Sequence, residues 1–232
     1  MAHGKKYRAA LEKFDPIQVY SLAEAIKLAV ETSTTSFDGS VEIHMHLGVD
    51  PKQAEQQLRS TVALPHGTGK TVRVVAFVGD DLVKAAKAAG AIEAGSADLI
   101  EKIEKGWMDF DVAVATPDLM KELGKIARTL GQTGLMPNPK SGTVTPDVEK
   151  AIGEIMKGQV EFRNDKLANL HNVIGKVSFG SDKLLENAKV YLKAVNDKKP
   201  EKMKGNFIKS ITVTTSMGPG IKVEISETMS SL

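Results

Sequence analysis

The sequence contains no cysteine, and only 5% of its 232 residues are aromatic. The absence of cysteine excludes disulfide-bonded scaffolds, thiolate zinc fingers, iron–sulfur clusters and a cysteine nucleophile. No apolar run approaches the roughly 20 residues of a membrane-spanning helix, and the first residues lack the apolar stretch of a signal peptide. We therefore expect a cytoplasmic protein that makes no contact with a membrane.

Charge is distributed unevenly along the chain, although the net value is only +2. Residues 1–66 and residues 67–158 each carry one more acidic than basic side chain, whereas residues 159–232 carry 12 basic and 8 acidic ones. Within the first of these segments, the first 13 residues contain four of the basic side chains and only one acidic side chain. A localised basic surface is typical of proteins that bind a polyanion, but solvated lysines without a partner explain the charge equally well.

Between residues 67 and 158, short apolar runs alternate with amphipathic stretches. Residues 72–78 and 111–115 are almost continuously apolar, which is typical of strands buried on both faces. Thr116-Pro117 is a start signal for a helix whose apolar residues recur at helical spacing up to Gly131. Alternating strands and helices of this length predict a small parallel α/β domain.

The two flanks of this segment show the patterns of a mixed α+β domain. Ser21 and Glu24 form a capping box before a helical stripe of apolar residues. Residues 41–47 alternate apolar and polar side chains, as a half-exposed strand does. The same alternation occurs in residues 210–214 and 221–225, on either side of a turn.

Neither flank is long enough to bury a stable core alone. We therefore expect residues 1–66 and 159–232 to form one discontinuous α+β domain that resembles a split β-α-β fold. Residues 67–158 are then an inserted three-layer α/β domain of Rossmann-like type.

Similarities to nucleotide-binding and catalytic motifs fail on their context. His66–Thr71 looks like the end of a phosphate-binding loop, but Leu64 occupies the position of its first glycine, and the segment leads into a strand instead of a helix. No serine stands in a nucleophile elbow. We predict no catalytic residue and no cofactor, and we keep a nucleotide-binding module or an enzyme built on residues 67–158 as the alternative.

Two further groups of polar residues have simple structural explanations. His44 and His46 share one strand face but lack a third ligand at a supporting spacing, so we predict no metal site. The carboxylate pairs Asp80-Asp81 and Asp109 with Asp111 lie beside strand ends, where an N-cap and a turn explain them better than general acid–base catalysis does.

A row of hydroxyl side chains marks the strand near the end of the chain. Thr212, Thr214 and Ser216 fall on one strand face, and Gly218 in the following turn lets another backbone approach closely. Hydroxyls and exposed peptide groups suit the recognition of ribose 2′-hydroxyls and phosphates in RNA. A hairpin with a polar outer face explains the same residues without any ligand, and a protein-interaction module is a further possibility.

Seven separated motifs follow one another along the chain. They are Phe37-Asp38, Leu64–Lys70, Gly106–Asp111, Thr116–Asp118, Leu135–Lys140, Phe162–Lys166 and Ser216–Pro219. Together they resemble the bacterial ribosomal L-one family, which forms the mobile stalk of the large ribosomal subunit, and the resemblance covers essentially the whole chain.

The resemblance implies a structural RNA-binding protein and not an enzyme. Members of the family bind large-subunit rRNA in the stalk, help deacylated tRNA to leave the exit site, and repress translation of their own mRNA through its leader. The resemblance also implies two domains in a protein that is a monomer when free of the ribosome. The implied hinges are Pro65, His66, Gly67, Gly158 and Gln159.

The resemblance further implies which side chains contact RNA. His46, often lysine in the family, and Gln132-Thr133, usually Pro-Arg, depart from the family pattern. We expect Gly218→Val to weaken RNA binding by at least ~2 kcal/mol and to leave the melting temperature almost unchanged. The implied contacts are Lys5 and Arg8 to phosphate, and Phe37, Asn164, Asp165, Lys166, Ser210, Thr212, Thr214, Ser216, Met217 and Gly218.

Overall fold

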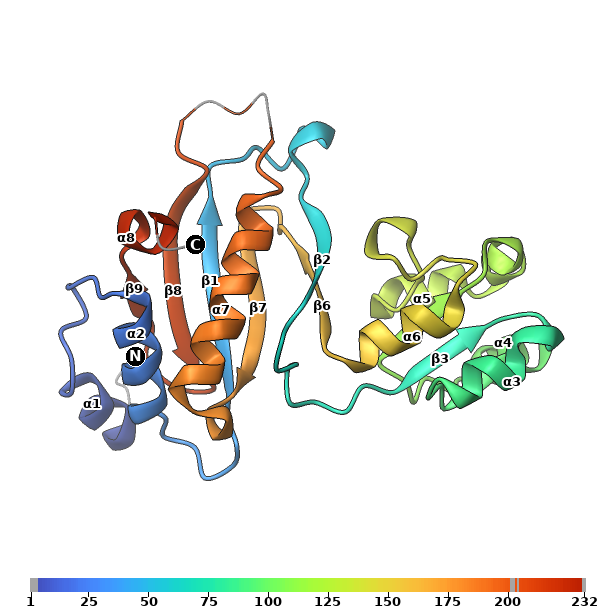
Figure 1. Cartoon of the computed structure of the whole chain (residues 1–232), viewed down its shortest axis with the longest axis horizontal. Coiled ribbons are helices and arrows are strands. Elements are labelled where there is room, and N and C mark those ends of the chain that lie inside the picture. The colour runs from blue at the N-terminus through green and yellow to red at the C-terminus, as the bar shows by residue number, and fades with distance from the viewer. Residues whose placement is uncertain (1–3, 201–202, 204, 231–232) are drawn as a thin grey trace. The chain divides into compact units, whose positions relative to one another are not determined.

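The computed structural model describes residues 4–200, 203 and 205–230 and divides the chain into two compact units (Figure 1). The first unit combines the chain up to Gly69 with the chain from Val160 onward, and the second spans Lys70–Gln159. Mixed helices and strands in several sheets confirm the predicted fold class. That residues 1–66 with 159–232, and residues 67–158, each form an independent domain stays a prediction.

The first unit contains a four-stranded antiparallel sheet in the order β7-β1-β8-β9. Its long strands are β1 (Ser40–Leu47), β7 (Asn169–Lys176) and β8 (Ile208–Thr215), and β9 (Ile221–Val223) is short. A separate two-stranded ribbon pairs β2 (Arg59–Ala63) with β6 (Gln159–Arg163).

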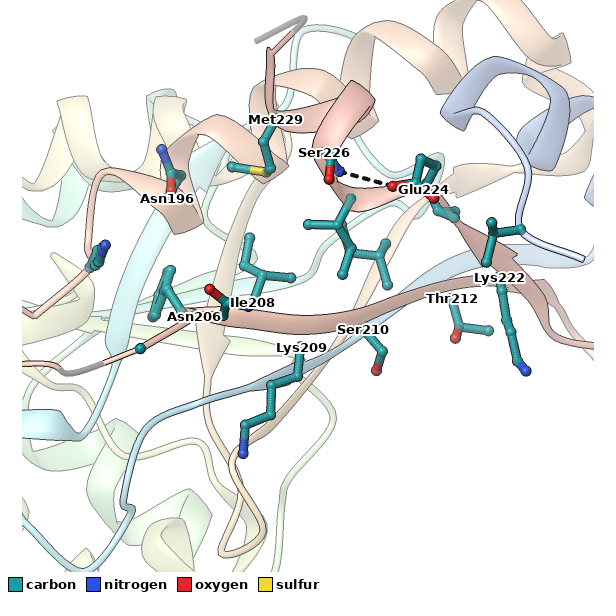
Figure 2. Close-up of a pocket in the computed structure, with 17 residues that line it drawn as sticks. Asn196, Asn206, Ile208, Lys209, Ser210, Thr212, Lys222, Glu224, Ser226 and Met229 are labelled. Atoms are coloured by element: carbon teal, nitrogen blue, oxygen red, sulfur yellow. Dashed lines mark hydrogen bonds between the residues drawn. The ribbon is translucent and has the colours of Figure 1, made fainter.

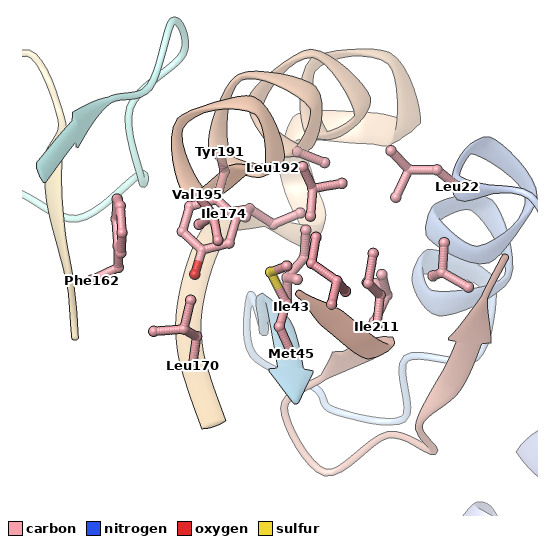
Figure 3. Packing of buried hydrophobic residues seen from close by; sticks show 14 of the residues in the cluster. Leu22, Ile43, Met45, Phe162, Leu170, Ile174, Tyr191, Leu192, Val195 and Ile211 are labelled. Atoms are coloured by element: carbon pink, nitrogen blue, oxygen red, sulfur yellow. The ribbon is translucent and has the colours of Figure 1, made fainter. Parts of the chain in front are cut away.

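One face of the four-stranded sheet is covered by α2 (Leu22–Glu31) and α7 (Gly180–Asn196). The predicted capping box is present, with Ser21 and Glu24 bonded reciprocally at the start of α2. Alternate residues of β1 are buried, because a strand points successive side chains to opposite faces. Figure 3 shows the packing between sheet and helices, which includes Leu22, Ile43, Met45, Leu170, Ile174, Tyr191, Leu192, Val195 and Ile211.

Short elements complete the first unit. They are the helices α1 (Lys5–Leu11) and α8 (Ile225–Ser230) and the 3₁₀ turns Ala54–Gln56 and Val177–Phe179. No helix of the described residues is long and apolar enough to cross a membrane.

The second unit is built on a three-stranded parallel sheet in the order β4-β3-β5. All four residues of the central strand β3 (Val74–Phe77) are buried, between β4 (Glu93–Gly95) and β5 (Val112–Ala115). One apolar cluster joins the sheet to α4 (Ala97–Glu104) and α5 (Ala127–Thr133). A second cluster joins it to α3 (Asp80–Ala88) and α6 (Val148–Met156), which gives the three layers.

The helix expected from Thr116 to Gly131 is not continuous. The chain forms two 3₁₀ turns, Pro117–Met120 and Glu122–Lys125, before α5 begins at Ala127. Leu123 and Ile126 are both buried, and residues three apart share a side in a 3₁₀ turn. Gly124 between them weakens the α-helical alternative. The burial of Leu123 and Ile126 agrees with the predicted apolar spacing, but the prediction of one continuous helix is wrong.

Candidate nucleic-acid interface

The face of the four-stranded sheet opposite α2 and α7 carries polar side chains that are exposed or half-buried. Register pairs His44 of β1 with Thr212 of β8 on one side and with His171 of β7 on the other, and Thr212 in turn pairs with Lys222 of β9. One polar row therefore crosses all four strands. We call this surface the polar face; it comprises Glu42, His44, His46, Asn169, His171, Ser210, Thr212, Thr214 and Lys222.

A tight turn follows β8 at one end of the polar face. The Gly218 amide donates to the Thr215 carbonyl (2.8 Å), and Met217 between them has φ 60° and a side chain that is 78% exposed. Such a conformation costs a residue other than glycine about 1–3 kcal/mol. Ser216 ties the turn to the central strand, because its hydroxyl accepts a hydrogen bond from the Ser40 amide (3.0 Å). An exposed apolar side chain on a strained, well-anchored turn is a candidate binding group.

Phe37 lies in the loop that leads into β1, beside this turn, and is 62% exposed. The loop is held in place on both sides of the ring: the Phe37 carbonyl accepts from the Thr35 hydroxyl (3.0 Å), and Asp38 accepts from the amide and the hydroxyl of Ser178 (3.0 and 2.7 Å). The bonds from Ser178 hold the pKa of Asp38 below its usual value. Phe37 and Met217 thus provide two exposed apolar groups at the same end of the polar face.

The opposite end of the polar face is formed by the turn between β6 and β7. The Ala168 carbonyl accepts from the Leu47 amide (2.9 Å), which fixes the turn to the end of β1. Asp165 accepts from the Asn169 backbone amide (2.7 Å), and this bond holds the pKa of Asp165 below its usual value. Lys166 is exposed. The turn therefore offers a cation at this end, while Asp165 shapes the loop.

Asn164 in the same turn is 8% exposed. Its side-chain Oδ1 accepts from the Leu58 backbone amide (2.9 Å), and the Asn164 backbone amide donates to the Leu58 carbonyl (3.1 Å). The side chain thus has a folding role next to β2. That Asn164 also contacts RNA stays a prediction.

Lys5 and Arg8 lie on α1 and are exposed. This helix lies beside the carboxyl end of α2, where Lys13 donates to the Glu31 carbonyl (3.0 Å), and is not part of the polar face. The predicted phosphate contacts of Lys5 and Arg8 therefore belong to a surface separate from the polar face.

Gly218 differs from expectation in its surroundings. A Cβ at this position would lie 2.3 Å from Thr215 Oγ1 and 3.3 Å from the Thr215 carbonyl oxygen. Thr215 is 3% exposed, so its side chain has little room to move. This geometry contradicts the expectation that Gly218→Val leaves the melting temperature almost unchanged, and we predict instead that it lowers the melting temperature.

Two cations of the site, Lys209 and Lys222, were missed by the sequence analysis. The register between β1 and β8 shifts at His46 and Leu47, which leaves Lys209 as an extra residue next to Ser210. Figure 2 shows the side chains of Lys209, Ser210, Thr212 and Lys222 on the same side of the strands. The sequence does indicate the bulge, because two consecutive polar residues between Ile208 and Ile211 break the strict alternation of apolar and polar side chains.

The histidines of the polar face contact one another. His44 Nδ1 lies 2.7 Å from His171 Nδ1, so one ring donates and the other accepts. Burial and then the charge of His171 lower the pKa of His44, against the opposing effect of Glu42. Among the residues that the structure describes, no three side chains of metal-binding type are grouped to hold an ion.

The segment that resembles a phosphate-binding loop has a structural role in the first unit. Buried Asn187 of α7 accepts from the His66 amide (3.1 Å) and donates to the Gly67 carbonyl (2.9 Å). Gly67 and Gly69 both have positive φ, and the chain then enters β3 without a helix at this point. The segment therefore lacks the helix N-terminus that a phosphate-binding loop needs.

The carboxylates Asp109 and Asp111 of the second unit form ion pairs. Asp111 accepts from the Lys70 ammonium (2.7 Å) and from the Arg73 amide (3.1 Å), while Asp109 pairs with the Arg73 guanidinium. The Lys70 bond, followed by those from Arg73, lowers the pKa of Asp111 to about 2. A carboxyl group held ionised in this way is unsuited to proton transfer near neutral pH.

Known proteins are similar to this sequence over nearly its full length. Residues 29–219 match the Ribosomal protein L1p/L10e family. Proteins named Large ribosomal subunit protein uL1 are 54% identical in Thermobifida fusca (97% of this chain, 95% of the relative), 54% in Mycobacteroides abscessus (96% and 94%) and 53% in Macrococcus caseolyticus (97% of each). These relatives are named as ribosomal proteins, in agreement with the prediction that the chain is not an enzyme. The predicted resemblance is confirmed: the chain belongs to the Ribosomal protein L1p/L10e family.

Proposed function

We propose that this chain is a component of the large ribosomal subunit in the cytoplasm and binds ribosomal RNA through the polar face and its two end turns. The name of the relatives, Large ribosomal subunit protein uL1, supports membership of that subunit. The observation that carries the RNA-binding role is the polar face itself, which has hydroxyl and cationic side chains on β8 and β9 and imidazole side chains on β1 and β7. Phe37 and Met217 are exposed at one end of it.

The proposed recognition is binding without chemistry. Hydroxyl groups both donate and accept, so Ser210 and Thr212 can pair with ribose 2′-hydroxyls as well as with phosphate oxygens. Lys209 and Lys222 at the border of this row supply the salt-dependent attraction to phosphates. Specificity then comes from the shape of a folded RNA that fits a fixed surface.

We also propose the finer roles that the family resemblance implies. An mRNA leader that presents the same shape as the ribosomal site could occupy the polar face, which would make repression of the protein's own translation a competition for one surface. Release of tRNA from the exit site would need movement at the segments that join the two units. Positive φ at Gly67 and Gly158 supports hinges at Pro65–Gly67 and Gly158–Gln159.

The test compares two isosteric variants of the full chain. Thr212→Val removes one hydroxyl from the polar face, and Thr61→Val removes one from a half-buried position in β2. Loss of a hydrogen bond worth about 1 kcal/mol weakens binding about five-fold. We expect this loss for Thr212→Val only, measured by filter binding to a stalk fragment of large-subunit rRNA.

Two controls separate this function from its alternatives. The same fragment made of DNA should bind more weakly, because it lacks the 2′-hydroxyls. Titration of ATP, GTP or a dinucleotide into the full chain should release no saturable heat. Equal affinity of both threonine variants and the wild type for the RNA would refute the assignment of the polar face.

A further inference from the structure

A groove of about 800 Å³ lies beside the polar face within the first unit (Figure 2). Its walls come from the end of α7, from β8 and β9, and from α8. Ser210, Thr212 and Lys222 belong to both the groove and the polar face. The two surfaces are therefore continuous.

The groove exists because β9 is shorter than β8. β9 pairs only with Ile211–Val213, while β1 pairs with β8 from Ile208 to Thr215. At Glu224 the chain turns away and donates its amide to the Tyr20 carbonyl (2.8 Å), after which α8 begins. Among the described residues, no strand pairs with the β9-side edge of β8 at Ile208–Ser210, so this edge is open to a ligand.

The groove carries an excess of positive charge. Its charged lining residues are Lys199, Lys209, Lys222 and Glu224, and the three lysines are exposed. Glu224 accepts from the Ser226 amide (3.3 Å), and none of the three lysines pairs with a carboxylate in the part of the chain that the structure describes. Unpaired ammonium groups on an open polar surface attract an anionic partner.

The side-chain amides of two asparagines add uncharged hydrogen-bond donors to the groove. Asn196 and Asn206 line the groove, and Figure 2 shows both on the opposite side of β8 from Lys209. Cations and amides thus border the open edge on two sides. A strand of nucleic acid that passes around this edge could contact both groups.

We infer that the groove binds the sugar–phosphate backbone of an RNA strand that continues from the polar face around the edge of β8. This inference rests on the proposed function and extends it to Lys199, at the end of the groove beyond α7. An acidic peptide is the competing occupant, but it could add backbone hydrogen bonds only along the three residues Ile208–Ser210. The continuity with the polar face favours RNA.

The test uses Lys199 because it lies in the groove and outside the polar face. Lys199→Ala is compared with Lys189→Ala, which removes an exposed lysine of α7 that does not line the groove. Affinity for a stalk rRNA fragment with its flanking strands is measured between 50 and 200 mM salt. One lost phosphate contact lowers the magnitude of the slope of log affinity against log salt by about 0.7–0.9 and weakens binding about five- to eight-fold at 0.1 M salt.

We expect this change for Lys199→Ala, a larger one for Lys199→Glu, and none for Lys189→Ala. Equal affinities and slopes for Lys199→Ala and Lys189→Ala, with Thr212→Val still impaired, would overturn the groove inference and leave the proposed function intact. Absence of RNA binding by the wild type would overturn both proposals.

Discussion

The turn at Gly218 lies so close to the Thr215 side chain that a larger residue at position 218 should destabilise the first unit. Gly218→Ala adds a single carbon that would lie 2.3 Å from Thr215 Oγ1, far closer than two atoms can pack. Thr215 is 3% exposed, and its hydroxyl has no hydrogen-bond partner in the described structure. The threonine side chain must therefore rotate within a packed site, or the turn must open.

The expected cost follows from the general cost of overpacking a core, about 1–3 kcal/mol. A unit of this size loses roughly 2–4 °C of melting temperature for each kcal/mol. Gly218→Ala should therefore lower the melting temperature by roughly 2–12 °C. RNA affinity should fall as well, because Met217 in the same turn would be displaced.

Thermal unfolding by circular dichroism, with a double-mutant cycle, checks the cause. Thr215→Ala removes the clashing Oγ1, so Gly218→Ala should cost less than about 0.5 kcal/mol in that background. Gly4→Ala serves as a control, because a Cβ there has nothing within 4 Å. The same loss of stability in both Thr215 backgrounds, or no loss at all in the wild type, would refute the reasoning.

Three further predictions concern residues around the polar face. Asn164→Ala should reduce the free energy of unfolding in urea by about 1–3 kcal/mol, because the Leu58 amide loses its buried acceptor; an unchanged midpoint would contradict this. The lowered pKa of His44 means that the unfolded chain binds a proton more readily, so this contribution to stability is complete above pH 6.5 and is lost as pH falls below it. His44→Gln should therefore narrow the difference in urea midpoint between pH 7.5 and pH 5, and an unchanged difference would count against it. Met217→Gly should raise the melting temperature by relieving the positive φ and should weaken RNA binding by removing the exposed side chain; loss of stability would show that Met217 is not strained.

Regular patterns made much of the fold predictable. The alternation in residues 41–47 predicts the buried side chains of β1 because every second residue of a strand faces the core. The capping box at Ser21 marks the start of α2 because the first backbone amides of a helix have no carbonyl partner, and the Ser21 and Glu24 side chains supply acceptors. Both signals act over a few residues, which is why sequence alone contains them.

Features that depend on contacts between distant segments could not be predicted in this way. The bulge at Lys209 follows from pairing with His46 and Leu47, about 160 residues earlier in the chain. The clash at Gly218 depends on how the turn folds back over Thr215. The folding role of Asn164 depends on Leu58, a neighbour in space that lies just before β2. Each of these contacts changes a prediction about the site and not the prediction of the fold.

Strain in the first unit is concentrated where the polar face ends. Ala168 and Met217 are the two residues other than glycine with positive φ among those described, and they lie in the turns at opposite ends of that face. Both turns are bonded to the same strand: Leu47 donates to the Ala168 carbonyl at one end of β1, and Ser216 donates to the Ser40 carbonyl at the other.

β1 is the strand that holds the whole site in place. It is paired on both sides and its inner residues are fully buried, so each turn is bonded to one of the least mobile strands of the core. The backbone at both ends of the proposed interface is therefore anchored to the core. In the RNA binding proposed above, the ordering cost then falls on the RNA and on a few exposed side chains such as Phe37, Lys209 and Met217. A polar surface that is ordered in advance in this way can discriminate between RNA shapes.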